Sequence, residues 1–213
     1  MKKLLLLILS FSIKAQDVKI GTQTWTSKNL DVETYRNGDN IPEAEMNNGW
    51  FFLKTGAYCY YNEITDNGIM YGKLYNRYAV NDPRGLAPKG YHVPTDAEWT
   101  KLTDYLGGNS IFEQAGTKMK STNNWGLGNG TNTSGFAGLP GGVAGNGDFY
   151  YIREKGFWWS SSEKNTTADK SLTYKAKSVE ALAWTCELYA ISGNVKRNFT
   201  GKYNGLSVRC IKD

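Results

Sequence analysis

The stretch His92-Val-Pro-Thr-Asp-Ala-Glu-Trp99 says more about the fold than any other part of the chain. Thr95 is followed by Glu98 at the spacing of a capping box, in which a hydroxyl and a carboxylate bond the unpaired N–H groups of a helix start. An apolar stripe follows at helical spacing, formed by Trp99, Leu102 and Leu106. The stretch therefore predicts a helix that starts at Thr95, buries one face and ends at Gly107-Gly108.

The strings around this helix start occur in a particular order. HVPTDAEWTKL is similar to the LPTEAEW helix start of the formylglycine-generating-enzyme branch of C-type-lectin-like folds. The ordered strings are YGKLYNRYAV (71–80), PKGYHVPTDAEW (88–99), SGFAGLPGG (134–142), GFWWSSSE (156–163) and GLSVRC (205–210). In this order they resemble the Fibrobacter succinogenes major paralogous domain, a secreted bacterial family, from about Val18 to Asp213. The resemblance implies an α+β, C-type-lectin-like domain with two short helices, antiparallel sheets and long irregular loops.

The first residues of the chain have the composition of a signal peptide. Lys2-Lys3 precede an apolar run from Leu4 to Ile13, and Ala15 offers a small residue for cleavage. The run is shorter than the roughly 20 residues that span a bilayer, and no Cys follows it for lipid attachment. We therefore expect a signal peptide over 1–15 and a single domain over 16–213. The product would be exported to the periplasm, the cell surface or the medium, with no membrane span after cleavage.

The charge of the chain argues against nucleic-acid binding. Loss of the leader removes Lys2, Lys3 and Lys14, which takes the formal net charge from +5 to +2. The remaining Lys and Arg residues are scattered among acids, whereas a nucleic-acid binder shows a clustered basic face.

Patterns elsewhere predict further elements. Ser110 and Glu113 repeat the capping-box spacing and predict a second helix through about Lys120. The Gly- and Asn-rich segment from Thr122 to Gly147 predicts a long loop region. Alternation predicts an entering strand over Asp17–Trp25, another over Ala57–Asn62, and a C-terminal antiparallel meander of Ala181–Ile191, Asn194–Thr200 and Leu206–Ile211.

Three cysteines occur, Cys59, Cys186 and Cys210. Export permits disulfides, but an odd count leaves at least one thiol unpaired within the chain. Cys186 alternates with Trp184 and Leu188, and Cys210 alternates with Leu206 and Val208, so both thiols are expected to face the core. A Cys186–Cys210 bridge and two buried inert thiols both remain open, and Cys59 is expected to stay reduced. The resemblance implies a further Cys where this chain has Ala87.

The sequence lacks residues that the common catalytic sites require. His92 is the single histidine, in a position typical of structural residues, and no spacing typical of a zinc site or of a nucleophilic serine occurs. The resemblance also implies a comparison with formylglycine-generating enzymes, whose copper chemistry depends on a pair of C-terminal cysteines. This chain has Cys186 and Cys210 in that region, but not the motif that surrounds the pair in those enzymes. We expect no metal or other cofactor and favour a non-enzyme. Two carboxylate pairs stay open, Glu163 with Asp148 and Glu180 with Glu187.

Binding is the function that the residues favour. Sugar recognition uses flat aromatic faces together with amides and carboxylates, often on loops held by a sheet. The loop region offers that mixture in Trp125, Asn132, Asn146, Asp148, Tyr150 and Tyr151. The competing interpretation is that Trp125, Phe149 and one of the tyrosines plug the loops into the core, while Trp158-Trp159 and Trp184 are core residues.

We therefore predict a secreted, non-catalytic binding or adhesion module for a glycan or a cell-surface protein. One alternative is a structural subunit of an envelope or extracellular assembly. The other is an enzyme that uses one of the carboxylate pairs.

Overall fold

The structure is a computed structural model, and it describes residues 17–108, 114–128, 130–164 and 182–213. The strands are β1 (Asp17–Ile20), β2 (Gln23–Thr26), β3 (Tyr58–Cys59), β4 (Leu74–Tyr75), β5 (Tyr91–His92), β6 (Gly141–Gly145), β7 (Asp148–Ile152), β8 (Lys155–Lys164), β9 (Leu182–Tyr189), β10 (Val195–Thr200) and β11 (Ile211–Lys212). The α-helices are α1 (Thr65–Tyr71), α2 (Arg77–Val80), α3 (Asp96–Tyr105) and α4 (Ala115–Met119). Short 3-10 helices are η1 (Met46–Asn48), η2 (Trp50–Phe52) and η3 (Tyr61–Glu63). The fold is mixed α+β, with mostly sheet and a few short helices.

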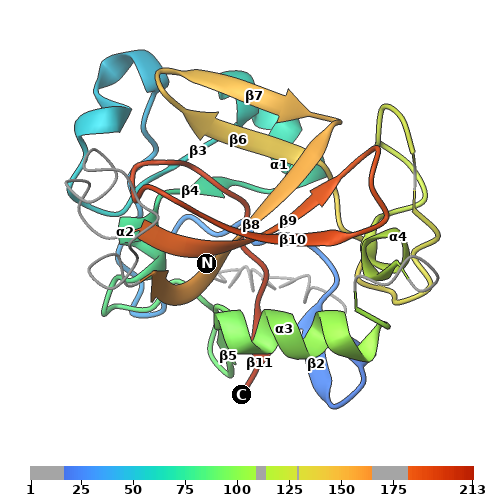
Figure 1. The fold of residues 1–213 in the computed structure, drawn as a ribbon. Helices are drawn as coiled ribbons and strands as arrows, with labels where there is room; N and C mark the ends of the chain where they lie inside the picture. Colours follow the sequence, from blue (N-terminus) through green and yellow to red (C-terminus); the bar gives the residue numbers. More distant parts are fainter. Residues whose placement is uncertain (1–16, 109–113, 129, 165–181) are drawn as a thin grey trace, which may run out of the picture.

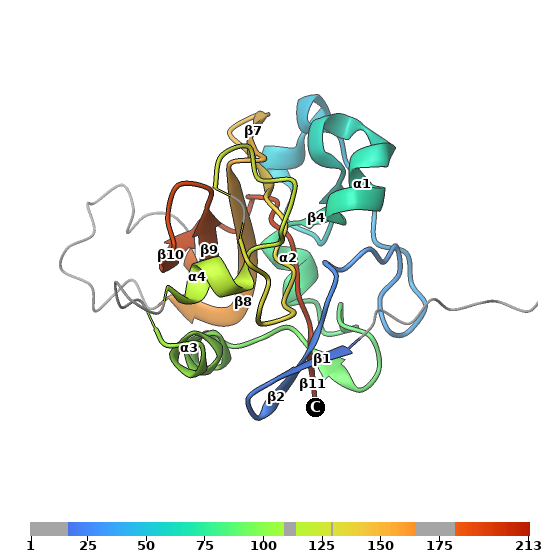
Figure 2. The same ribbon diagram turned by 90° about the vertical axis from the view of Figure 1, so that its right-hand side faces the viewer.

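Helix α3 forms as predicted. The Thr95 hydroxyl accepts a hydrogen bond from the Glu98 backbone N–H at 3.2 Å, and Glu98 Oε2 accepts one from the Thr95 N–H at 2.8 Å. Both halves of the capping box are therefore present. The predicted stripe of Trp99, Leu102 and Leu106 is buried, and Gly107 follows the helix with a positive φ of 101°. Helix α3 packs under the strands β8 and β9 (Figures 1 and 2).

The strands form three sheets (Figure 1). A five-stranded sheet has the order β10-β9-β8-β6-β7, a four-stranded sheet the order β1-β2-β11-β5, and β3 pairs with β4. The four-stranded sheet joins the two ends of the described chain, because Ile211 of β11 lies between Trp25 of β2 and His92 of β5. In the five-stranded sheet β6 runs parallel to β8, and the other neighbouring pairs are antiparallel.

Two strand predictions were wrong in extent. The predicted strand Asp17–Trp25 is a hairpin of β1 and β2, because Gly21 turns the chain with a φ of 60°. The predicted strand Ala57–Asn62 is reduced to Tyr58–Cys59, since residues 61–63 wind into η3.

The C-terminal meander was correct for β9 and β10, which pair antiparallel, and wrong for its third stretch. Residues 206–211 do not pair with β10: this segment crosses to β11 in the other sheet. Its alternation is real, but Ser207 and Arg209 on the second face are as buried as Leu206, Val208 and Cys210. The segment runs between layers and is buried on both faces. An alternating pattern normally indicates a strand with one exposed face, and for this reason it did not predict the path of this segment.

Arg209 shows how this segment tolerates a buried charge. Its Nε donates to Asn29 Oδ1 at 2.8 Å, Nη1 to the Thr26 and Phe136 carbonyls at 2.7 Å each, and Nη2 to the Ala137 carbonyl at 3.1 Å. Every nitrogen of this fully buried guanidinium therefore has an acceptor, as burial of a charged donor requires.

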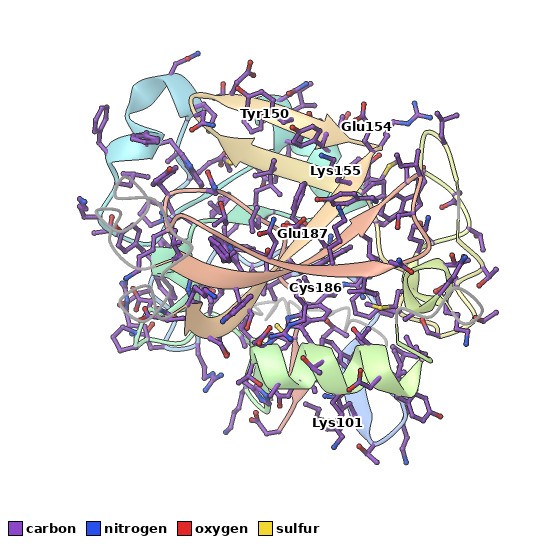
Figure 3. The ribbon with its side chains drawn as sticks, viewed as in Figure 1. Lys101, Tyr150, Glu154, Lys155, Cys186 and Glu187 are labelled. Atoms are coloured by element: carbon purple, nitrogen blue, oxygen red, sulfur yellow. The ribbon has the colours of Figure 1, made fainter. Side chains whose placement is uncertain are left out.

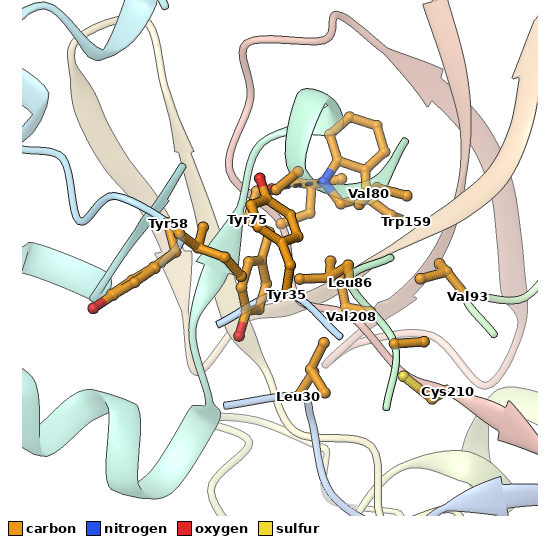
Figure 4. Packing of buried hydrophobic residues seen from close by; sticks show 14 of the residues in the cluster. Leu30, Tyr35, Tyr58, Tyr75, Val80, Leu86, Val93, Trp159, Val208 and Cys210 are labelled. Atoms are coloured by element: carbon orange, nitrogen blue, oxygen red, sulfur yellow. Dashed lines mark hydrogen bonds between the residues drawn. The ribbon is translucent and has the colours of Figure 1, made fainter. Parts of the chain in front are cut away.

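In the described part of the chain, the buried hydrophobic residues form three packed clusters. One surrounds Tyr75 and Trp159, whose indole N–H donates to the Tyr75 carbonyl at 2.7 Å (Figure 4). A second lies between α3 and the five-stranded sheet around Trp99 and Trp158, and a third surrounds Trp50. Trp158 and Trp159 are fully buried, as predicted, and as neighbours in a strand they point to opposite faces and enter different clusters.

Trp184 departs from its predicted core position. It shares a strand face with Cys186 and Leu188 but is half-buried. Its ring lies edge-on to Phe199, with the Lys164 ammonium 4.5 Å and the Arg197 guanidinium 5.1 Å from its centroid. Charged side chains, rather than core residues, cover this end of the sheet face.

All three cysteines are buried and free. Cys186 belongs to the cluster beneath α3 and Cys210 to the cluster around Tyr75 and Trp159, so the structure favours the buried thiols over the Cys186–Cys210 bridge.

The predicted signal peptide lies outside the described residues, as does the capping box of Ser110 and Glu113. The adjacent α4 does form, from Ala115 to Met119. Among the described residues, every helix is too short or too polar to cross a bilayer.

Candidate functional site

The five-stranded sheet has one face against α3 and a second face with a cavity. Trp158, Cys186 and Leu188 occupy the α3 face. The intervening residues point the other way, with Phe157 of β8 opposite Glu187 of β9, and Lys155 opposite Tyr189. Figure 3 shows Lys155 and Glu187 near the middle of this sheet.

A cavity of about 220 Å³ lies on this face, and we call it the sheet cavity. Its aromatic lining residues are Tyr151, Phe157, Tyr189 and Phe199, and its aliphatic ones are Val143 and Leu206. Its polar walls are Lys155, Thr185, Glu187, Asn198, Thr200 and Asn204. Aromatic rings and hydrogen-bonding side chains therefore converge on one space, as in sites for small polar ligands.

Tyr151 reaches the cavity through an unusual backbone. Its φ is 67°, in the left-handed region that bulky residues rarely adopt. The normal alternation of a strand is lost there, and the rings of Tyr150 and Tyr151 lie with centroids 6.0 Å apart. The Tyr151 ring also lies 6.2 Å from that of Phe157, which makes one aromatic wall from two strands. Strained backbone of this kind clusters at functional sites.

Lys155 organises the aromatic side. Its ammonium lies 3.6 Å from the ring centroid of Tyr151 and 4.9 Å from that of Tyr189. Lys196 covers Tyr189 from β10, at 4.4 Å. These cation–π contacts hold both tyrosine rings in place and leave a positive charge at the cavity wall.

Glu187 supplies a buried carboxylate, with 4 % of the residue exposed. Its Oε1 accepts a hydrogen bond from the Thr185 hydroxyl at 3.1 Å, and its Oε2 accepts one from the Tyr189 hydroxyl at 2.8 Å. Burial, together with the hydrogen bond to Glu187, raises the pKa of the Tyr189 phenol, so this hydroxyl stays a donor. A carboxylate oxygen can accept more than one hydrogen bond, and Glu187 therefore retains acceptor capacity toward a ligand.

Two amides complete the polar walls. Asn198 lies on β10, where its Oδ1 accepts from the Phe199 N–H at 2.9 Å. Asn204 donates from Nδ2 to the Thr200 hydroxyl across the turn that follows β10. Both side chains are thereby oriented, and the Asn198 amide group remains available as a donor.

The predicted loop residues do not form one site. Tyr151 lines the sheet cavity and is 43 % exposed, and its neighbour Tyr150 is 38 % exposed. Asn146 lies in the β6–β7 turn, and Asp148 is the first residue of β7, where its Oδ1 accepts from the Phe149 N–H at 2.7 Å. Asn132 stabilises its own loop by accepting from the Ala137 N–H at 2.7 Å.

Trp125 is a correction to the predicted site. It is 3 % exposed, and its indole N–H donates to Ser121 Oγ and to the Gly138 carbonyl. Its ring is therefore part of the core and offers no face to a ligand. Phe149 also packs inward, with its ring 5.3 Å from that of Tyr61.

Sequence reasoning missed Phe157 and Tyr189, and it considered Glu187 only as a carboxylate paired with Glu180, although the signal was present. Since Cys186 and Leu188 were assigned to the core face, Thr185, Glu187 and Tyr189 had to share the opposite face. Glu187 therefore stands between two hydroxyl residues on one strand face, and this pattern could have indicated a polar site there.

The carboxylate pairs and metal-ligand groups considered from the sequence can be located in the structure only in part. Asp148 begins β7, whereas Glu163 contacts Lys202 and Asn81, so these acids have different neighbours. Glu180, the proposed partner of Glu187, lies outside the described residues. Within the described part of the chain, no group of three His, Cys, Asp or Glu side chains is placed to hold a metal ion.

The fold and the cavity together define a mixed α+β domain that carries an aromatic and polar cavity on one face of its five-stranded sheet. The chain belongs to the Fibrobacter succinogenes major domain family, which matches residues 18–212. No curated protein and no solved structure matched the chain.

Proposed function

We propose that this protein is a non-catalytic carbohydrate-binding module and that the sheet cavity is its sugar site. The observation that carries the proposal is the joining of Tyr151, Phe157 and Tyr189 to the buried Glu187 carboxylate in one cavity. A sugar ring presents C–H groups on its faces and hydroxyls at its edge. Aromatic walls suit the first, and a carboxylate with amides suits the second.

The size of the cavity fits a short ligand. About 220 Å³ is below the usual range for drug-sized ligands, so we expect one or two sugar units to be held directly. The open side of the sheet face would allow the rest of a longer glycan to extend into solvent.

A binding role is favoured over glycoside hydrolysis. Hydrolysis in most families uses two carboxylates roughly 5–10 Å apart. Among the described residues that line the sheet cavity, Glu187 is the one acid. Its hydrogen bonds to Thr185 and Tyr189 fix it as an acceptor for hydroxyl groups.

We further propose that the domain is of the C-type-lectin-like type and that it is exported. The pairing of β11 with β2, which brings the chain ends together, supports the first, as does the packing of α3 on the central sheet. The basic and apolar leader supports the second.

The experiment is a glycan array with the purified chain, followed by calorimetric titration of the best ligand into variants. Tyr151→Ala should weaken binding about tenfold, because one stacking wall is lost. Glu187→Gln keeps the shape and should weaken binding about tenfold or more, because a charge-assisted hydrogen bond is lost. Tyr105→Ala is the matched control, since Tyr105 is 65 % exposed on α3, on the other side of the sheet.

The outcomes separate the possibilities. Binding that Tyr151→Ala and Glu187→Gln leave intact would move the sugar site elsewhere. An array without signal would favour the alternative of a structural subunit, and release of reducing ends during titration would show an enzyme.

One observation supports that structural alternative. Phe52 is 80 % exposed and Phe51 43 % exposed, and the Phe51 ring lies 4.3 Å from that of Tyr203. Exposed aromatic groups of this kind mark protein contacts. If the chain is an assembly subunit, Phe52→Ser should abolish co-purification of a partner and leave sugar binding unchanged.

A further inference from the structure

Two lysines lie on the cavity face of the five-stranded sheet. Lys155 of β8 lines the sheet cavity and is the direct cross-strand partner of Tyr189. Lys196 of β10 is the direct cross-strand partner of Glu187. Directly opposed residues of neighbouring strands share a face, so Lys196 lies on the same face as Glu187 and Tyr189. The cavity face therefore has a lysine on either side of β9.

Both ammonium groups lie close to the ring of Tyr189. The nitrogen of Lys155 is 4.9 Å from the ring centroid, and that of Lys196 is 4.4 Å from it. The hydroxyl of the same ring donates to Glu187 at 2.8 Å. The two cations thus lie near the body of the ring and the carboxylate at its hydroxyl end, so opposite charges occupy different parts of the cavity wall.

Neither lysine is neutralised by an acid of the described chain. Among the residues that the structure describes, no carboxylate lies within ion-pair distance of either ammonium group, Glu187 included. Other cations are paired, for example Lys73 with Asp31 at 2.5 Å and Arg84 with Asp82 at 2.8 Å. An aromatic ring supplies no full negative charge, so a cation held by rings alone keeps its capacity to pair with an anion.

A ligand can reach these ammonium groups. Lys155 is half-buried and Lys196 is exposed. Lys155 has no hydrogen-bond partner within the described chain, yet its nitrogen is not among the unpaired side-chain atoms that are sealed from solvent. That nitrogen is therefore accessible. A molecule in the sheet cavity can approach Lys155 directly, with Lys196 on the neighbouring part of the same face.

We propose that the sheet cavity binds an acidic sugar, whose carboxylate or sulfate group pairs with Lys155 and Lys196 beside the Tyr189 ring while its hydroxyls bond Glu187. This inference rests on the proposed function and names the ligand class of the same site. Two cations and one carboxylate face the cavity in the described chain, so the charge balance favours an anionic sugar over an amino sugar. A neutral sugar would leave both ammonium groups without a counter-charge.

The test compares matched methyl glycosides by ¹⁵N NMR titration of the purified chain. Each pair consists of a uronic acid and its neutral sugar, in the gluco, galacto and manno configurations, and methyl glucoside 6-sulfate supplies the other anionic group. We expect an acid or the sulfate to bind about tenfold more tightly than its neutral partner. Binding of a uronic acid without the sulfate identifies a carboxylate ligand, the reverse identifies a sulfated sugar, and binding of both shows that the cavity recognises charge.

The dependence on salt gives a second readout. Raising sodium chloride from about 50 mM to about 500 mM should weaken binding of the acidic sugar several-fold, because added ions screen accessible charge pairs. Binding of the neutral partner should stay the same. A preference for the acid that does not depend on salt would assign it to shape and would overturn the charge pairing.

Variants assign the preference to the two lysines. Lys155→Gln should reduce the preference for the acid from about tenfold to about twofold, whereas Lys155→Arg keeps the charge and should retain it. Lys196→Gln, at an exposed position, should reduce the preference about two- to threefold. The matched control is Lys101→Gln, an exposed lysine on α3, on the other side of the sheet (Figure 3). If Lys155→Gln fails to fold, Lys196→Gln and the salt dependence of the unaltered chain still decide.

The outcomes separate this inference from the proposed function. Equal affinity for the acid and the neutral sugar in every pair, with binding weakened by Tyr151→Ala, would overturn the acidic ligand and leave the sugar site in place. A preference for the acid that persists in both Lys155→Gln and Lys196→Gln would overturn the acidic ligand at these residues. Absence of binding by acidic and neutral sugars alike would overturn the proposed function itself.

Discussion

At the scale of single residues, the start of α3 is held by a cluster of polar side chains. Glu98 bonds the Thr95 N–H and hydroxyl through Oε2, and its Oε1 contacts His92 Nε2 at 2.9 Å. His92 Nδ1 contacts Asp213 at 2.8 Å, which ties the helix start to the C-terminus. The histidine thus has a structural role, in agreement with the sequence-based expectation.

Removing either half of the capping box should destabilise the domain. Thr95→Ala and Glu98→Ala should each lower the free energy of unfolding by roughly 0.5–2 kcal/mol, because N–H groups at the helix start lose their acceptors. Urea unfolding measures this. Lys101→Ala, on the exposed face of the same helix, is the control and should stay within about 0.5 kcal/mol. Sugar affinity should not change, and a stability equal to that of the unaltered chain would show that the cap is dispensable.

The same cluster predicts a pH dependence. Burial alone lowers the pKa of His92, but the hydrogen bonds and charges of Asp213 and Glu98 together raise it above 6.5. A raised pKa in the folded state stabilises the fold fully below the unfolded pKa, and this contribution is lost as pH rises through the folded pKa.

Glu98 limits the pH range over which the His92 cluster stabilises the fold. Burial raises its pKa, but bonds from Thr95 and His92 outweigh this, so its net pKa is lowered from 4.5 and its contribution is lost as pH falls. The stability difference between the unaltered chain and His92→Gln should therefore be larger near pH 5.5 than near pH 8.5, to be measured by urea unfolding at both, with about equal salt. A difference that grows with pH would contradict this assignment.

At the scale of elements, the hairpin of β6 and β7 sets the edge of the sheet cavity. Gly145 pairs with Asp148, so Asn146 and Gly147 form a two-residue turn. Their φ angles are 53° and 82°, as a type I′ turn requires. The turn fixes the register that leads to Tyr151, and thus the position of one cavity wall.

Gly147 offers a clean test of this turn, because a Cβ added there would meet no atom within 4 Å. Gly147→Ala should lower the free energy of unfolding by about 1–2 kcal/mol through backbone conformation alone. Gly147→Asn should cost less, since Asn tolerates the left-handed region. Thermal unfolding of the variants gives the order, and equal stabilities would mean that the turn adopts another form.

At the scale of the whole molecule, the three core clusters each contain one cysteine. Cys59 lies in the cluster around Trp50, Cys186 beneath α3 and Cys210 beside Val208. Burial raises the pKa of all three thiols, that of Cys210 to about 12. Thiol reactivity therefore reports on the integrity of each cluster.

The native protein should not react with a maleimide, and all three thiols should react after denaturation without reductant. Mass spectrometry counts the labels, and digestion shows which cluster opens first as denaturant is added. Two missing labels after denaturation would reveal a Cys186–Cys210 bridge, and labelling of Cys59 in the native state would contradict its burial.

The sequence by itself determined the features that depend on neighbouring residues. Local patterns predicted the capping box and apolar stripe of α3, its end at Gly107 and the pairing of β9 with β10, because capping hydrogen bonds and periodicity act over a few residues. The ordered sequence strings also indicated the family. Only the tertiary structure decided the path of residues 206–211 between layers, the burial of Trp125 and the joining of Tyr151 to Glu187. It also left Nε and Nη1 of Arg77 buried without a hydrogen-bond partner in the described part of the chain. These features depend on residues that are distant in sequence and come into contact only when the layers pack. A pattern of hydrophobic and polar residues does not specify which distant residues will be in contact.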